Sequence, residues 1–166
     1  MAEGGPIVRR ATSEDLPKIG RLGALLIAEH HDFDARRFLA PRPRTPVDYA
    51  SYLGTQLDDP DVAVLVADQD GDVIGYVYAA MEGYDYMALR GPAGALHDVV
   101  VDPAFRRRGV GRRLLDAALA YLRSRGAPRV VLSTAVQNEP AQSLFASLGF
   151  RRTMIEMTRE LDDEHG

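Results

Sequence analysis

One continuous stretch, residues 97–115, constrains the fold more than any other part of the chain: it reads HDVVVDPAFRRRGVGRRLL. Its first part is an apolar, β-branched run that is typical of a buried strand. Its last part opens a segment with apolar residues at helical spacing. Asp-Pro, three arginines and Gly-Val-Gly lie between the two. The order predicts a strand, a tight turn and a helix, and the arginines and glycines of the turn need a separate explanation.

The remaining sequence predicts a sheet and several helices around this stretch. Asp70-Gly71 between two apolar runs is a hairpin signal, and Gly126-Ala127-Pro128 ends the helix that follows the arginines. We expect strands at 6–11, 62–69, 72–81, 94–101, 129–136 and 151–161, and helices at 12–29, 47–58, 110–125 and 139–148. This order predicts an α/β fold with a mixed, mostly antiparallel sheet and helices on both faces.

Length, charge and composition exclude several classes of protein. With 166 residues, the chain is expected to form a single domain over 1–166 with a core that needs no disulfides. It has no cysteine, which excludes a thiolate metal site. The net charge of −4 gives no overall attraction to nucleic acid or anionic lipid. Without a signal-peptide core or a membrane-length apolar run, we expect a soluble, cytoplasmic protein with no nucleic-acid or membrane partner.

The turn between the strand and the helix is a candidate anion site. A helix that begins directly after a strand presents unpaired N–H groups and the positive end of its dipole. Gly109 and Gly111 would let the backbone approach an anion closely, and the arginines can contact phosphate oxygens. Neither nucleotide-binding fingerprint is present. A glycine-containing turn with solvated arginines is the open alternative.

Two motifs together resemble the GCN5-related N-acetyltransferase (GNAT) superfamily. The acetyl-CoA loop [Q/R]-x-x-G-x-[G/A] and the later pattern N-x-x-A-x-x-x-[Y/F]-x-x-x-G-F are matched by Arg106, Gly109, Gly111, Asn138, Ala141, Phe145, Gly149 and Phe150. The opening IVRRATSEDLPKI is similar to the first strand and helix of that superfamily, so the resemblance covers nearly the whole chain.

The resemblance implies acetyl-CoA as co-substrate, bound between splayed central strands. It places Val99, Val100 and Val101 along the pantetheine arm, and Asn138, Ala141 and Phe145 near the pantetheine or acetyl end. It places Arg106, Arg107, Arg108, Gly109, Val110, Gly111 and Arg112 at the pyrophosphate.

An amine must lose a proton before it can attack a thioester, so a base or a water relay is useful. Many members of the superfamily carry a glutamate for this on the splayed strand, where this chain has His97 followed by Asp98. Strand alternation would place His97 on the face of Val99 and Val101 and Asp98 on the opposite face. Histidine titrates near neutral pH, so His97 is the first candidate base and Asp98 the second. A half-buried structural histidine is the open alternative.

The general acid is the clearest departure from the family pattern. Many members use a tyrosine in the last helix to protonate the leaving thiolate, and here that position is Phe145, which has no proton to donate. Ser143, Tyr121 or another hydroxyl could substitute, or water could protonate the thiolate, since an ordinary thiol pKa permits it.

The resemblance implies that the amine acceptor binds against the first helices and the loop before the splayed strand. His30, Asp34, Tyr84 and Tyr86 in these segments would suit a cationic amine through ion pairing and cation–π contact. Nearby arginines would equally suit a carboxylate, and solvated surface charge is the simpler role for most of these groups. Adjacent histidines on a helix do not converge on a metal, so no metal site is expected.

The leading interpretation is an acetyl-CoA-dependent N-acetyltransferase that acetylates a primary amine of a small molecule or a protein. The alternative is a catalytically inactive, CoA-binding regulatory module of the same fold. A nucleotide-binding α/β protein is a weaker third interpretation, because the sequence contains neither nucleotide-binding fingerprint. Met154 and Met157 in the expected last strand would allow a homodimer, although core packing is their simpler role.

Overall fold

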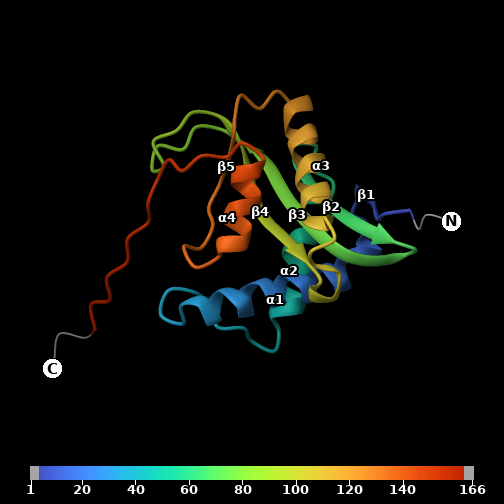
Figure 1. Ribbon diagram of the computed structural model, residues 1–166, viewed down its shortest axis with the longest axis horizontal. Helices are drawn as coiled ribbons and strands as arrows, with labels where there is room; N and C mark the ends of the chain where they lie inside the picture. Colours follow the sequence, from blue (N-terminus) through green and yellow to red (C-terminus); the bar gives the residue numbers. More distant parts are fainter. Residues whose placement is uncertain (1–3, 163–166) are drawn as a thin grey trace.

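The computed structural model describes residues 4–162, which form a five-stranded sheet flanked by helices (Figure 1). The strand order is β1-β2-β3-β4-β5, antiparallel throughout except for the parallel pair β4 and β5. The strands are β1 Ile7–Arg10, β2 Val62–Gln69, β3 Asp72–Glu82, β4 Ala93–Val101 and β5 Val130–Leu132. The helices are α1 Leu16–Phe33, α2 Thr45–Gly54, α3 Val110–Ser124 and α4 Glu139–Ser147, with short 3-10 turns at Ser13–Asp15 and Pro103–Phe105.

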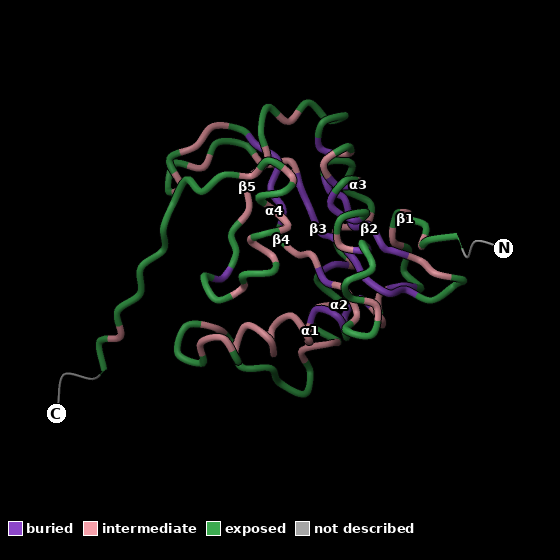
Figure 2. The backbone as a smooth tube through the Cα atoms, in the orientation of Figure 1, coloured by how far each residue is buried: buried purple, intermediate pink, exposed green. Residues whose placement is uncertain are grey.

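Helices cover both faces of the sheet, and each face has its own core (Figure 2). On one face, Leu114 and Leu122 of α3 pack against Val77 of β3, and all three are fully buried. On the other, Ile19 of α1 and Leu53 of α2 are fully buried against the same sheet. The predicted mixed, mostly antiparallel sheet with helices on both faces is confirmed.

The β2–β3 hairpin turns where the Asp-Gly signal predicted it. Asp70 and Gly71 both have positive φ, 54° and 88°, which is the backbone that a two-residue turn of this kind requires. Asp70 tolerates this conformation better than most side chains, and glycine adopts it without cost.

The sheet opens between β4 and β5. Strand β5 spans three residues instead of the eight predicted, and it pairs with β4 only opposite Gly94–Leu96. The chain leaves the sheet after Leu132, so from His97 onward β3 is the only strand within residues 4–162 that pairs with β4. The expected splay of the central strands is therefore confirmed.

A β-bulge in β4 changes the direction of His97. Tyr78 of β3 pairs with Asp98, and the next pair is Ala79 with Leu96, so His97 is the extra residue. The His97 ring lies 5.0 Å from the ring of Tyr78, on the face that α1 and α2 cover. The expectation that His97 shares a face with Val99 and Val101 is therefore wrong, because an extra residue interrupts strand alternation.

The strand predicted at 151–161 is also wrong. This segment, called the tail below, leaves the body of the protein after α4 and has no regular secondary structure (Figure 1). Its alternating pattern suits a strand, but a strand forms only beside a partner, and no other strand of the described chain lies against it. Separately, none of the helices within residues 4–162 is long and apolar enough to cross a bilayer.

Candidate functional site

The loop between β4 and α3 has the backbone geometry of an anion site. Arg107 and Gly109 have positive φ, 63° and 77°, and Gly109 directly precedes the helix. The backbone N–H of Arg113 donates to the Gly109 carbonyl at 3.1 Å. The N–H groups before it, from Val110 to Arg112, have no carbonyl to reach within the helix. They are directed outward at the positive end of the α3 dipole.

The arginines of this loop do not all point the same way. Arg106 donates through Nε to the Val101 carbonyl at 3.0 Å and through Nη2 to Glu29 of α1 at 2.6 Å. Its side chain therefore ties the loop to β4 and α1 rather than reaching outward. Arg108 lies over the Phe105 ring at 5.5 Å, and Arg112 lies 4.0 Å from Asp116 one turn along α3.

The open edge of β4 carries unused backbone groups. The N–H of Asp102 donates to Ile74 at 2.8 Å, toward β3, and the Val101 carbonyl accepts Arg106 on the opposite side. Because N–H and C=O directions alternate along a strand, those of Val99 also point into the opening, while those of Val100 point to β3. Val100 is buried in the core on the other face. Of the three valines, Val99 offers both its backbone and its side chain to the gap.

A cavity lies in this gap and brings together residues from α1, β4, the end of β5 and the segment after it, and α4. Its lining comprises Leu26, His30, Leu96, His97, Asp98, Val99, Leu132, Ser133, Thr134, Asn138, Ala141 and Phe145. Both candidate bases, Asn138 at the start of α4, the two candidates within α4, and His30 thus meet at one place, although they are spread over more than a hundred positions of sequence.

Asp98 is the most constrained polar group of this cavity. Its Oδ2 accepts hydrogen bonds from the hydroxyls of Tyr49 on α2 and Tyr76 on β3, the latter at 3.1 Å. Burial raises the pKa of Asp98 above its usual range, against the opposing effect of the two hydroxyls. Its other oxygen, Oδ1, accepts no hydrogen bond from the described residues. Every fully buried side-chain oxygen of those residues has a hydrogen-bond partner, so Oδ1 is not fully buried and contacts solvent.

His97 lies at the margin of the cavity in a different environment. Its Nε2 is 2.7 Å from Oε1 of Glu82 at the end of β3, and Arg90 donates to the other Glu82 oxygen at 2.7 Å. The side chain is 40% exposed. One ring nitrogen is thus engaged by a carboxylate.

Helix α4 supplies an amide and an aromatic ring. The Oδ1 of Asn138 caps the helix by accepting from Ala141 N–H at 3.3 Å. Within the described chain nothing accepts from its Nδ2. Phe145 lies edge-on to Phe150, with ring centroids 5.9 Å apart.

The hydroxyl groups predicted as proton donors lie outside the cavity, and other hydroxyl groups line it. Ser143 does not line the cavity, and the Tyr121 hydroxyl donates to the Pro60 carbonyl, away from it. Two hydroxyls that sequence reasoning missed, on Ser133 and Thr134, do line it. Tyr49 and Tyr76 were missed as well. A tyrosine on a helix or strand carries no sequence signal that it will contact an aspartate far along the chain.

Three of the four predicted acceptor residues lie outside the cavity. Asp34 accepts the N–H groups of Arg36 and Arg37 at 3.0 and 3.2 Å in the turn after α1. Tyr84 and Tyr86 stack on each other in the β3–β4 loop, 72% and 77% exposed. His30 does line the cavity, and its Nδ1 lies 2.8 Å from the Leu26 carbonyl. A carbonyl only accepts, so Nδ1 carries the proton of this contact.

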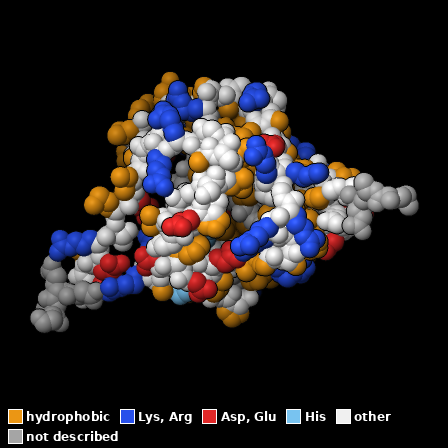
Figure 3. All heavy atoms as spheres, viewed as in Figure 1, with side chains coloured by type: hydrophobic (Ala, Val, Ile, Leu, Met, Phe, Trp, Pro, Cys, Tyr) orange, Lys and Arg blue, Asp and Glu red, His pale blue; other side chains and the backbone are white. Residues whose placement is uncertain are grey.

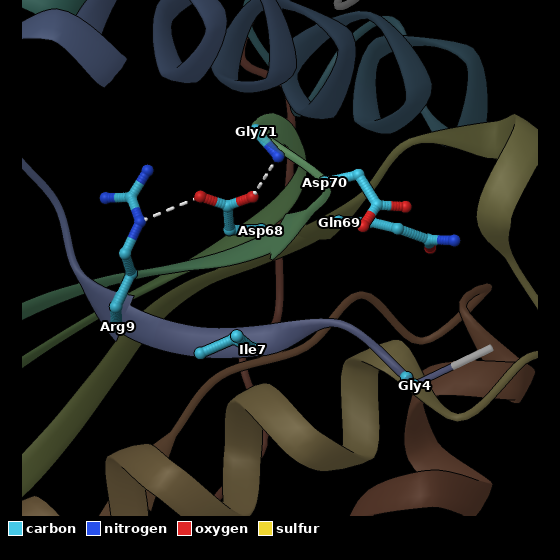
Figure 4. Close-up of a pocket in the computed structure, with 8 residues that line it drawn as sticks. Gly4, Ile7, Arg9, Asp68, Gln69, Asp70 and Gly71 are labelled. Atoms are coloured by element: carbon cyan, nitrogen blue, oxygen red, sulfur yellow. Dashed lines mark hydrogen bonds and ion pairs between the residues drawn. The ribbon is translucent and has the colours of Figure 1, made fainter. Parts of the chain in front are cut away.

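A second, open hollow lies at the β1 edge beside the β2–β3 turn (Figure 4). Two of its charged groups contact each other: Arg9 donates to Asp68 at 3.0 Å, and Asp68 accepts the N–H of Gly71 at 2.7 Å. The other nitrogens of Arg9 contact Asp15. Arg9 and Asp68 are thus engaged within the protein, and none of the candidate residues lines this hollow.

Comparison with known proteins identifies the family of this chain. Residues 27–150 match the profile of the Acetyltransferase (GNAT) family. This match covers most of the chain, and the chain therefore belongs to that family.

Several curated relatives are mycothiol acetyltransferases. The protein of Nocardioides sp. is 33% identical over 94% of this chain and 50% of its own length. That of Thermobispora bispora is 40% identical over 55% of this chain and 31% of its own length. The chain thus spans about a third to a half of the length of these relatives. An N-alpha-acetyltransferase of Sulfurisphaera tokodaii is 29% identical over 66% of this chain and 70% of its own length.

Solved structures share the fold at lower identity. A tetramutant of the BH1408 protein of Bacillus halodurans has a TM-score of 0.80 at 23% identity, covering 93% of this chain and 99% of that one. The aminoglycoside N-acetyltransferase AAC(6')-Iy in complex with CoA has a TM-score of 0.73 at 22% identity, covering 98% and 99%.

Proposed function

We propose that the protein is an acetyl-CoA-dependent N-acetyltransferase that acetylates a primary amine. One observation carries the proposal: the open edge of β4 runs from the Asp98 cavity to the outward N–H groups at the start of α3. A group that binds along this path would place its far end against Asp98 and its anionic part at the helix terminus.

The residues present fit acetyl-CoA. The Val99 N–H and C=O in the opening match the amides of a pantetheine arm. The N–H groups of Val110 to Arg112, with the side chains of Arg107 and Arg108, suit a pyrophosphate. Asn138 Nδ2 is free to donate near the thioester end, and Ala141 and Phe145 line it. Acetyl-CoA supplies the activated acetyl group as a thioester.

We assign the proton-accepting role to Asp98. Its Oδ1 keeps solvent contact in the cavity, and the raised pKa makes it a stronger base than an exposed carboxylate. The hydroxyls of Tyr49 and Tyr76 hold the carboxylate in place through Oδ2. His97 is the second candidate, since Glu82 already engages its Nε2. Ser133, Thr134 or water would return a proton to the leaving thiolate.

The relatives support a small-molecule amine as acceptor, with a protein amine as the other class. Mycothiol acetyltransferases and an aminoglycoside N-acetyltransferase are among the similar proteins, and so is an N-alpha-acetyltransferase. That residues 1–166 form one acetyltransferase domain, and that it works in the cytoplasm, stay predictions. The alternative is a CoA-binding module without catalysis, favoured by the phenylalanine at the position of the usual tyrosine.

A thiol-release assay with acetyl-CoA and a panel of amines tests the proposal. Loss of a general base costs about 10²- to 10⁴-fold in rate, so we expect Asp98→Asn to lose activity to that extent. His97→Ala should retain most of it. Wild-type activity should fall as pH is lowered through the raised pKa of Asp98, because only the ionised carboxylate accepts a proton.

The outcomes separate the candidates. A large loss in His97→Ala with full activity in Asp98→Asn would transfer the base to His97. Binding of acetyl-CoA without thiol release on any amine would favour the non-catalytic module.

A further inference from the structure

His30 is the one imidazole of the cavity whose Nε2 has no hydrogen-bond partner among residues 4–162. Its Nδ1 donates to the Leu26 carbonyl at 2.8 Å, one turn earlier in α1. In a neutral imidazole the nitrogen without the proton is an acceptor, so Nε2 of His30 presents a lone pair. His97, by comparison, has its Nε2 2.7 Å from Glu82. His30 therefore brings an uncommitted proton acceptor to the cavity.

The His30 ring is held in a fixed position. The rings of Phe33 and Phe38 lie edge-on to it, with centroids 5.5 and 5.1 Å away. The preceding residue, Glu29, accepts a hydrogen bond from Arg106 at 2.6 Å, which ties this turn of α1 to the loop before α3. A catalytic group held in place by its neighbours needs little rearrangement when it reacts.

His30 lines the same small space as Asp98 and α4. The cavity has a volume of about 90 Å³, so a group that fills it lies close to every wall. Figure 1 places the second half of α1 next to the start of α4, and residues of both elements line the cavity. Burial has the largest effect on the pKa of Asp98, which it raises, and a charge on His30 acts in the opposite direction. A proton on His30 is thus felt at Asp98.

The surroundings favour an acceptor that arrives as an ammonium ion. Figure 3 shows acidic side chains over the lower middle of the face, where Figure 1 places α1 and the start of α4. Glu29 of α1 and Glu139 of α4 belong to these elements. Acetylation removes two protons from an ammonium nitrogen, one before it attacks and one as the amide forms. Asp98 can accept only one of them in a turnover, so the reaction needs a second proton carrier.

We propose that His30 carries the second proton from the attacking nitrogen to the leaving sulfur, an inference that rests on the proposed function. Asp98 takes the first proton; the nitrogen lone pair then bonds to the thioester carbon, and the C=O electron pair moves onto oxygen. Nε2 of His30 takes a proton from the nitrogen, which is now positively charged. The C=O bond re-forms, the C–S bond breaks with its electron pair on sulfur, and Nε2 gives its proton to the thiolate. His30 ends neutral, as it began, and Asp98 returns its proton to water.

This role supplies the proton that Phe145 cannot donate. A carrier must accept and release a proton within one turnover, and imidazole is the side chain best suited to this near neutral pH. The hydroxyls of Ser133 and Thr134 can pass a proton on only while they receive another. Among the groups that line the cavity, His30 is therefore the one that can first accept the proton and then return it.

Matched substitutions at two adjacent histidines test this role. His30→Asn keeps an N–H near the position of Nδ1, for the Leu26 carbonyl, and removes Nε2. His31→Asn is the control, because the Nδ1 of His31 lies 3.1 Å from the Phe38 carbonyl and the residue does not line the cavity. With the panel amine that wild type acetylates fastest, we expect kcat to fall about 10²- to 10⁴-fold in His30→Asn and to stay unchanged in the control. CoA affinity by calorimetry and the melting temperature should be the same in both variants.

Added imidazole separates proton transfer from a structural role. His30→Ala leaves space at the cavity wall, and free imidazole should restore part of the lost activity in proportion to its concentration. The acetylated amine is measured by mass spectrometry. The rate without enzyme is subtracted, because imidazole itself reacts with thioesters.

The outcomes distinguish this role from the proposed function. Full activity in His30→Asn, equal losses in the two Asn variants, weaker CoA binding in His30→Asn, or no restoration by imidazole would overturn the role of His30 and leave the N-acetyltransferase assignment intact. A wild type that acetylates no amine of the panel would overturn the proposed function, and the role of His30 with it.

Discussion

At the scale of single residues, the position of Asp98 depends on the extra residue in β4. The bulge turns His97 toward Tyr78 and Glu82, and it leaves Asp98 between the hydroxyls of Tyr49 and Tyr76. Sequence reasoning could find the pair of candidate bases, because the resemblance places them. It placed Asp98 correctly, on the face opposite Val99 and Val101, but not His97, since HDVVV reads as unbroken alternation and the bulge depends on pairing with β3.

Gly109 permits a residue-scale test of the anion site. Gly109→Glu places a side chain at positive φ and a negative charge beside the outward N–H groups, so we expect acetyl-CoA binding to be lost. Gly126→Glu is the matched control: it has the same kind of backbone, φ 87° against 77°, and equally open space, but lies after the other end of α3. Isothermal titration calorimetry on both should show binding lost only in Gly109→Glu; equal affinities would place the pyrophosphate elsewhere.

At the scale of elements, close contact between α1 and α2 positions Tyr49. A Cβ on Gly23 would lie 2.3 Å from the Tyr49 ring, and one on Gly20 would lie 2.2 Å from the Pro46 carbonyl. The two helices therefore meet where α1 has no side chains, and Tyr49 reaches Asp98 across this contact.

Gly23→Ala should displace Tyr49 from Asp98. Overpacking of this kind typically costs about 1–3 kcal/mol, so we expect a lower free energy of unfolding together with slower acetyl transfer. Gly54→Ala is the control, because its Cβ would meet only the flexible end of Leu16 at 3.2 Å. Urea denaturation and the thiol-release assay check both variants. Full activity in Gly23→Ala would show that the Tyr49 contact is dispensable.

The opening between β4 and β5 makes a separate prediction about backbone groups. Bound acetyl-CoA should protect the Val99 amide from hydrogen exchange, because that N–H points into the gap. The Val100 amide faces β3 and should not change. NMR-detected exchange with and without CoA distinguishes the two neighbours, and equal protection of both would mean that the ligand does not pair with β4.

Local signals predicted most elements, and contacts between distant segments decided the rest. The Asp70-Gly71 turn and the strand–loop–helix stretch were predicted correctly, because each is specified by residues next to one another. Strand β5 was predicted too long, since RVVLSTAV does not show that the chain leaves the sheet after Leu132. The tail has the pattern of a strand, but pattern alone does not supply a partner edge.

In the whole molecule, ion pairs join α1, which lines the cavity, to the loop between β4 and α3, and Lys18 pairs with Asp102 at 3.3 Å. Arg106 links the loop to Glu29 of α1, and His30, the next residue of that helix, lines the cavity. The side that would receive the acceptor is thereby fixed relative to the side that would hold acetyl-CoA. Sequence patterns could not predict this link, because Glu29 and Arg106 are far apart along the chain.

Thermal unfolding with acetyl-CoA, CoA, ATP and NAD in parallel shows whether the β4 opening and the start of α3 form a binding site for CoA. A ligand that binds only the folded protein, present at about 100 times its dissociation constant, should raise the melting temperature by about 5–10 °C. We predict this rise with acetyl-CoA and CoA, and none with ATP or NAD. No rise with acetyl-CoA or CoA would contradict the assignment of the β4 opening and the α3 terminus as a cofactor site.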